Sequence, residues 1–79
     1  MLIVYTKRGC PWCAEALAFL RGRGVAFEER DARENPPYLE ELKKKSGQDK
    51  TPTLDLNGDI LADTDAAAIE PWLRSKGVL

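Results

Sequence analysis

The chemistry that this sequence can carry is sulfur chemistry. Its only cysteines, Cys10 and Cys13, are separated by two residues. The chain contains no histidine, which excludes Ser-His and Cys-His nucleophile pairs and imidazole acid–base catalysis. A disulfide that closes so short a loop restrains the unfolded chain very little, so a catalytic or metal-binding pair is favoured over a structural crosslink.

Thiol–disulfide exchange requires a thiolate, and the position of Cys10 favours one. A helix is predicted to begin at Pro11, where unpaired backbone N–H groups and the positive end of the helix dipole stabilise negative charge. Lys7 and Arg8 add cationic charge on the preceding turn. Cys13 lies one helical turn further on, so we expect Cys10 to be the attacking thiol and Cys13 the resolving thiol.

The two residues between the cysteines are expected to support this pair. Pro11 fixes the backbone of the first helical turn, where its missing N–H costs nothing. Trp12 cannot take part in the thiol chemistry itself. We expect its ring to be an exposed apolar surface against which a substrate packs beside Cys10.

Metal binding is the main alternative chemistry for such a pair. A zinc site needs four ligands, and one copy of this chain offers two thiolates and no imidazole. No metal site is therefore expected within one chain. A zinc ion bound by four thiolates of two chains, or an iron–sulfur cluster between two chains, remains open.

The pattern of apolar and turn residues along the rest of the chain predicts an α/β fold. Short apolar runs rich in β-branched residues indicate strands, apolar residues at helical spacing indicate helices, and Asn57-Gly58 is a strong hairpin signal. The expected elements are a strand over 2–6, a helix over 11–23, a strand over 25–30, a helix over 36–46, strands over 53–56 and 59–62, and a helix over 65–76.

This order, βαβ-α-ββα, predicts a mixed four-stranded sheet covered by three helices, within a single domain over residues 1–79. The first strand, the first helix and the second strand form a βαβ unit, so the first two strands should be parallel. Pro71 lies inside the last helix and should bend or restart it.

Charge and hydropathy argue against nucleic acids and membranes as binding partners. Lys and Arg number 12 and Asp and Glu number 13, a net charge of −1 that gives no support to nucleic-acid binding. No apolar stretch approaches the length that a bilayer demands, and the first residues lack the features of a secretory signal. We expect a cytoplasmic monomer with no bound cofactor. The run Lys43–Lys45 is expected to be the solvated end of the second helix.

The segment 4–13, Val-Tyr-Thr-Lys-Arg-Gly-Cys-Pro-Trp-Cys, resembles the active-site segment of glutaredoxins, with Trp12 in place of the usual Tyr. The resemblance continues through residues 24–29, Thr51-Pro52-Thr53 and Asn57-Gly58. It implies a thioredoxin-like fold and reversible disulfide reduction, commonly with glutathione as electron source. It also implies a cis peptide bond before Pro52, with the Thr51 backbone beside the sulfurs to pair with an extended substrate.

The same resemblance implies residues that hold glutathione. Lys7 would meet the glycyl carboxylate, and Thr51, with Pro52, would bind the cysteinyl backbone. The start of the last helix, at Thr64 and Asp65, would hold the γ-glutamyl end. Leu61-Ala62 stands where glutaredoxins usually have Gly-Gly, although the segment 62–66 also looks like that of some glutaredoxins and of the glutathione-transferase amino-terminal domain.

Three functions follow. The first is glutathione-dependent reduction of protein disulfides and glutathione mixed disulfides. The second is a ribonucleotide-reductase-type redoxin reduced by a thioredoxin-reductase-like flavoprotein, which the missing glycines favour. The third is an iron–sulfur cluster or metal carrier, a dimer bridged through Cys10, against which the presence of Cys13 counts.

Overall fold

A mixed four-stranded sheet organises the computed structural model, which describes residues 1–79. Its strand order is β2-β1-β3-β4. The central strand β1 (Leu2–Thr6) is parallel to β2 (Glu28–Asp31) and antiparallel to β3 (Thr53–Leu56), and β3 pairs with β4 (Asp59–Leu61) in an antiparallel hairpin. The predicted topology, including the parallel first pair, is confirmed.

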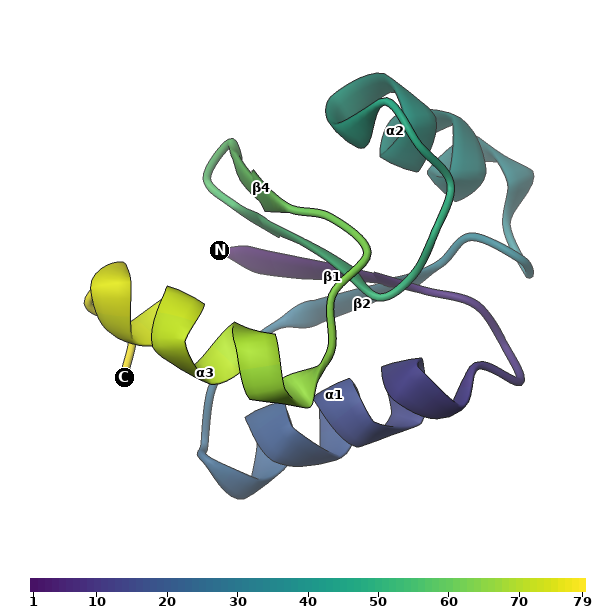
Figure 1. The fold of residues 1–79 in the computed structure, drawn as a ribbon. Coiled ribbons are helices and arrows are strands. Elements are labelled where there is room, and N and C mark those ends of the chain that lie inside the picture. Colours follow the sequence, from purple (N-terminus) through teal and green to yellow (C-terminus); the bar gives the residue numbers. More distant parts are fainter.

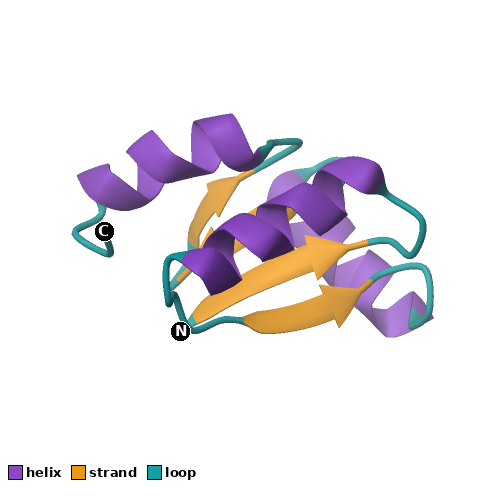
Figure 2. Cartoon of the chain, turned by 90° about the horizontal axis from the view of Figure 1, so that it is seen from below, coloured by secondary structure: helices purple, strands orange, loops and turns teal.

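Three helices cover the two faces of this sheet unequally. Helices α1 (Pro11–Gly22) and α3 (Ala66–Ser75) lie on one face, and α2 (Pro36–Ser46) lies on the other (Figure 1). Figure 2, drawn from the side of α1 and α3, shows these two helices across the strands. None of the three helices is long and apolar enough to cross a membrane.

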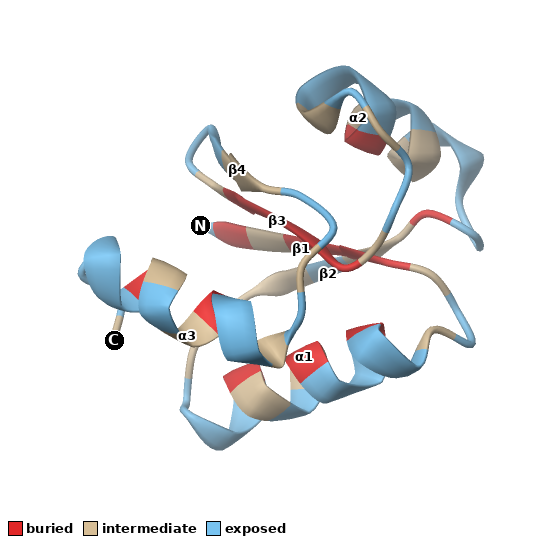
Figure 3. Cartoon of the chain, viewed as in Figure 1, coloured by how far each residue is buried: buried red, intermediate tan, exposed pale blue.

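The main core lies between the sheet and the pair α1 and α3. Figure 3 shows buried segments along the central strands and on the helix turns that face them. The fully or nearly buried apolar residues of this core are Leu2, Val4, Ala16, Leu20, Leu54, Ile69 and Leu73. These residues anchor α1, and therefore the cysteines at its start, against the sheet.

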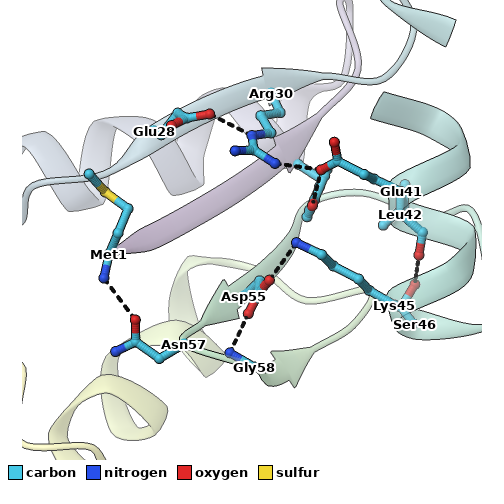
Figure 4. Close-up of polar contacts among 11 residues, drawn as sticks. Met1, Glu28, Arg30, Glu41, Leu42, Lys45, Ser46, Asp55, Asn57 and Gly58 are labelled. Carbon is cyan, nitrogen blue, oxygen red and sulfur yellow. Dashed lines mark hydrogen bonds and ion pairs between the residues drawn. The ribbon is translucent and has the colours of Figure 1, made fainter. Parts of the chain in front are cut away.

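The face under α2 is more polar. Its buried apolar residues are fewer, namely Tyr5, Ala32 and Leu42. They are surrounded by hydrogen bonds and ion pairs that we call the α2 network, drawn in part in Figure 4. The α2 network consists of Tyr5, Glu28, Arg30, Glu41, Lys45 and Asp55.

The second strand begins later than expected. The apolar alternation of Val25 and Phe27 predicts a strand over 25–30, but β2 spans Glu28–Asp31. The N–H of Val25 is used to end α1, because it donates to the carbonyl of Leu20 at 3.0 Å. Val25 and Phe27 pack against the main core from an irregular segment, so their pattern reflects burial rather than sheet pairing.

Helix α3 runs through Pro71 as one element, so the predicted restart does not occur. Proline removes one backbone hydrogen bond, to the carbonyl four residues earlier at Ala67. Both residues are exposed, so water can replace that bond. The hairpin forms as expected: Asn57 and Gly58 have φ values of 52° and 100°, the left-handed pair that a tight hairpin turn requires.

Candidate active site

Cys10 occupies the N-cap position of α1. Its backbone is extended, with φ −86° and ψ 112°, and its Sγ accepts a hydrogen bond from the backbone N–H of Cys13 at 3.2 Å. The sulfur thus takes the place of the oxygen that usually caps a helix. Pro11 is the first helical residue, as predicted. Gly9, with φ 86°, allows the turn that delivers Cys10 to this position.

The two sulfurs differ in exposure. Both thiols are reduced, Cys10 is half-buried, and Cys13 is only 3% exposed. Trp12 is 60% exposed, as expected for an apolar surface beside Cys10. The structure therefore presents one sulfur and one aromatic ring to solvent, and it shields the second sulfur.

The two thiols also differ in acidity. Burial of the Cys10 thiol opposes its ionisation and is the largest single influence on its pKa. Hydrogen bonds from the Cys13 side chain and backbone, the Thr51 hydroxyl and the Trp12 backbone N–H together outweigh burial, so the pKa of Cys10 is lowered. Burial raises the pKa of Cys13 to about 11, and its hydrogen bond to Cys10 raises it as well. Cys10 is thus the better thiolate.

Lys7 and Arg8, which the sequence predicts to stabilise the Cys10 thiolate, contact other groups instead. Lys7 Nζ donates to the carbonyl oxygen of Asp49 at 2.6 Å, and the Arg8 guanidinium forms an ion pair with Glu34. Both cations are therefore engaged with other groups. The leading causes of the lowered pKa of Cys10 are local hydrogen bonds at the start of α1, not these two charges.

Thr51 and Pro52 approach the sulfurs from the loop before β3. The Thr51–Pro52 peptide bond is cis, which confirms that prediction. The carbonyl oxygen and the Oγ1 of Thr51 both lie 3.8 Å from Cys10 Sγ. Pro52 is buried, and its carbonyl accepts the N–H of Thr64 at 2.9 Å. This bond ties the start of α3 to the same loop.

A cleft of about 420 Å³ opens beside Cys10. Four residues that the sequence predicts as glutathione contacts line it, namely Lys7, Thr51, Thr64 and Asp65. Pro11 and Trp12 line it too, whereas Cys13 does not. The structure therefore gathers at one cleft residues that are distant in sequence.

The start of α3 is only partly available to a ligand. The Asp65 carboxylate caps the helix by accepting the N–H of Ala68 at 2.9 Å. Thr64 Oγ1 is buried and has no hydrogen-bond partner. Its predicted role would therefore require a partner that the isolated chain does not supply.

Four charged residues of the cleft were missed by sequence reasoning: Arg33, Asp49, Lys50 and Asp63. Arg33 could have been found from the topology. Because β1 and β2 are parallel, their carboxyl ends meet at one edge of the sheet, and Arg33 follows β2 as Cys10 follows β1. Asp63, with φ 49°, carries no comparable sequence signal.

Comparison with known proteins agrees with this geometry. The family model described as glutaredoxin matches residues 2–61. Glutaredoxin 3 of Escherichia coli is 34% identical over 62 residues, which cover 78% of this chain and 75% of that protein. The solution structure of glutaredoxin from Brucella melitensis has a TM-score of 0.72 at 32% identity, covering 99% of this chain and 86% of that one. The crystal structure of the thioredoxin-like protein BC3987 has a TM-score of 0.82 at 27% identity, covering 90% and 97%.

The fold and these matches define the class, a thiol–disulfide oxidoreductase with a thioredoxin-like fold. Within that class, the chain belongs to the glutaredoxin family.

Proposed function

We propose that this protein reduces protein disulfides and glutathione mixed disulfides through Cys10 and Cys13, with glutathione as the reductant. The observation that carries the proposal is the position of Cys10 Sγ. It caps α1 and lies at the edge of the cleft that also contains Thr51 and the start of α3. A disulfide that enters this cleft meets the more acidic and more accessible of the two sulfurs.

The reaction begins at Cys10. Its thiolate attacks one sulfur of the substrate disulfide, a Cys10–substrate disulfide forms, and the other substrate sulfur leaves as a thiolate. The cap hydrogen bond from the Cys13 N–H and the contact with Thr51 favour the thiolate before the attack. Pro11 fixes the first turn, so the attacking sulfur is held in place.

Two routes then regenerate the reduced protein. With a protein substrate, Cys13 attacks Cys10, the Cys10–Cys13 disulfide forms, and the substrate is released. With a glutathione mixed disulfide, a second glutathione attacks the sulfur of the bound glutathione and releases Cys10 as a thiolate. Glutathione thus acts as a co-substrate and not as a resident cofactor.

The cleft offers complementary groups to glutathione, which carries two carboxylates and one ammonium group. Lys7 and Arg33 come from the β1 and β2 side of the cleft, where a glycyl carboxylate can bind. The start of α3 and Asp65 come from the β4 side, where the γ-glutamyl end can bind. Between them, the N–H of Thr51 makes no hydrogen bond within the protein and is free for the cysteinyl backbone.

A coupled assay with NADPH tests the reductant. One arm contains glutathione and glutathione reductase, and the other contains thioredoxin reductase; both contain the same mixed disulfide substrate. We expect NADPH consumption in the first arm. Efficient turnover in the second arm alone would reject glutathione and favour the flavoprotein-reduced redoxin, which Leu61-Ala62 supports. This proposal keeps the monomeric, cytoplasmic setting expected from the sequence, where thiols are held reduced.

A further inference from the structure

The resolving step leaves one proton unassigned. If Cys13 acts as proposed above, on which this inference rests, its thiol must lose a proton when its sulfur attacks the Cys10–substrate disulfide. Cys13 is 3% exposed, and the chain has no histidine to accept the proton. A thiol so shielded needs an acceptor within the protein or a path to water.

A second crevice adjoins both sulfurs. It has a volume of about 150 Å³ and shares Lys7 and Cys10 with the large cleft, whereas Trp12 and Thr51 do not border it. Cys13 borders this crevice and not the large cleft. Two carboxylates of β2, Glu29 and Asp31, also line it. The crevice is therefore the place where the Cys13 thiol and a proton-accepting group share one space.

Of these two carboxylates, Glu29 has the fewer hydrogen-bond partners. Asp31 Oδ1 accepts the backbone N–H groups of Arg33 and Glu34, at 2.8 and 3.0 Å. Glu29 makes one hydrogen bond, in which the Thr6 hydroxyl donates to its Oε2 at 2.9 Å.

The cations of the crevice do not neutralise Glu29. Lys7 and Arg8 both border the crevice. Lys7 Nζ donates to the carbonyl of Asp49, and Arg8 pairs with Glu34, as described above. None of the ion pairs of the protein involves Glu29, so its carboxylate has no cationic partner.

We propose that Glu29, held by the Thr6 hydroxyl, accepts the proton of Cys13 in the resolving step. The Cys13 S–H bond breaks and its proton passes through the crevice to the Glu29 carboxylate. The sulfur electron pair forms the Cys13–Cys10 bond, the Cys10–substrate bond breaks, and the substrate leaves as a thiolate. The two cysteines are oxidised by two electrons and the substrate disulfide is reduced by the same two.

The acidity of Cys13 is consistent with this division of roles. Its raised pKa has two leading causes, burial and the hydrogen bond to Cys10. In the mixed disulfide, Cys10 carries no charge, so the second cause disappears while burial persists. Cys13 is then closer to ionisation but still needs an acceptor, and Thr6, only 2% exposed, fixes Glu29 on the wall of the same crevice.

Ellman's reagent separates the two chemical steps of the full-length protein. In stopped flow, attack by Cys10 releases one thionitrobenzoate in a phase that depends on reagent concentration. Attack by Cys13 releases a second in an intramolecular phase that does not. In Glu29→Gln, we expect the second phase to slow by about tenfold to a hundredfold near pH 6. The first phase should be at least as fast as in the wild type, because a nearby negative charge has been removed.

The pH profile distinguishes proton transfer from a structural effect. The second phase of Glu29→Gln should rise in proportion to hydroxide concentration and meet the wild-type rate as the pH approaches the pKa of Cys13 in the mixed disulfide, which lies below the value of about 11 for the reduced pair. Thr6→Val should slow the second phase and Thr6→Ser should retain it, since serine keeps the hydroxyl. Glu15→Gln, an exposed carboxylate on α1, is the matched control and should leave both phases unchanged.

Each contrary outcome has one meaning. A second phase in Glu29→Gln that equals the wild-type rate near pH 6, or that is faster, overturns the role of Glu29. A uniform slowing at all pH values also overturns it, because that is the signature of misplaced sulfurs. A wild-type protein that shows the first phase and no second phase instead overturns the resolving role of Cys13 in the proposed function.

Discussion

Two groups of coupled titratable side chains lie on opposite faces of the sheet and behave differently. At the start of α1, Cys10 and Cys13 are joined by hydrogen bonds that pull their pKa values apart. Under α2, the α2 network joins charged groups and one buried hydroxyl: Lys45 Nζ donates to Asp55 Oδ2 at 2.7 Å, and the hydroxyl of the fully buried Tyr5 donates to Glu41 Oε1 at 2.7 Å. Coupling creates a reactive group in the first case and holds a helix in the second.

The difference follows from what each group faces. Cys10 borders a cleft and has few hydrogen-bond partners, so its thiolate remains available to react with a substrate. Asp55 is 6% exposed and accepts both Lys45 and the N–H of Gly58, so its charge is fully used within the fold. We therefore expect changes in the sulfur pair to alter activity and changes in the α2 network to alter stability.

The largest expected effect is on activity. Cys10→Ser should abolish disulfide reduction, because the serine hydroxyl does not ionise near neutral pH and cannot replace the thiolate. Its stability should be unchanged or slightly raised, since serine is a good N-cap and can accept the same N–H of Cys13. Turnover of a mixed disulfide and urea denaturation of the same sample measure the two quantities.

Cys13→Ser is the matched variant. It should retain exchange with glutathione mixed disulfides through Cys10 but lose the intramolecular release of protein substrates. If Cys13→Ser were the more damaging change with a glutathione mixed disulfide, the roles of the two sulfurs would be reversed.

The next effect is on stability. Lys45→Met leaves the Asp55 carboxylate buried without its cation, a change that costs about 3–5 kcal/mol for fully buried pairs. The Lys45 side chain is 33% exposed, so we expect about 1–3 kcal/mol of unfolding free energy to be lost. Activity per folded molecule should not change. Lys44→Met, on an exposed residue of the same helix, is the control and should be nearly neutral in urea denaturation; equal losses in both variants would show that the ion pair contributes nothing.

A third expected effect, the pH dependence of the unfolding free energy, distinguishes the α2 network from the sulfur pair. The Tyr5 hydrogen bond lowers the pKa of Glu41. For Asp55, burial raises the pKa, but the hydrogen bonds from Lys45 and the Gly58 N–H and the charges of Lys45 and Arg30 together outweigh burial and lower it. The folded protein then binds fewer protons than the unfolded chain, whose carboxyl pKa values are about 4. This stabilisation is present above about pH 5 and is lost as the pH falls through the folded values.

At alkaline pH the sign is opposite. Burial raises the pKa of Tyr5, and the bond to Asp55 raises that of Lys45, so their contribution is complete below about pH 9 and is lost as the pH rises through the folded values. Plotted against pH, the unfolding free energies from urea titrations should form a plateau between these limits. The decline on the acid side, which we call the acid limb, should be shallower in Lys45→Met. Reaction rates at Cys10 should instead rise within the plateau, at a pKa below about 8.5. An acid limb of the same depth in Lys45→Met would separate the pH dependence from the α2 network.

The sequence predicts the sulfur pair far better than the α2 network. Local signals are enough to place Cys10 at a helix start, because the strand, the glycine turn and the proline are adjacent in the chain. The run Lys43–Lys45 looks like a solvated helix end, and all three lysines are exposed in the last turn of α2. The sequence does not reveal that Lys45 also forms an ion pair. Its partner Asp55 lies on β3, and only the packing of α2 on the sheet brings them together.

The same distinction explains the cleft. Most of the expected residues that belong to recognisable motifs line it, namely Lys7, Cys10, Pro11, Trp12, Thr51, Thr64 and Asp65, whereas Cys13 and Pro52 do not. Asp49 and Lys50 lie in a loop without a pattern and are placed by the fold alone. The late start of β2 has a similar origin, because a strand needs a partner, and Ile3 of β1 pairs first with Glu28.

The smallest expected effect concerns Thr64, whose buried hydroxyl has no hydrogen-bond partner. Thr64 Oγ1 has no partner, so Thr64→Val removes no hydrogen bond and should leave the unfolding free energy within about 1 kcal/mol of the wild type, or raise it. If glutathione supplies the missing partner when it binds at the start of α3, the variant should show a KM for glutathione raised by about two- to tenfold, which corresponds to one net hydrogen bond. Reaction with a small neutral disulfide should be unaffected, because that substrate does not reach α3. Asp65→Ala is a poorer probe, since it also removes the cap of α3. An unchanged KM in Thr64→Val would mean that the ligand leaves this hydroxyl unpaired, and Thr64 would then belong to the packing of the loop and not to the glutathione site.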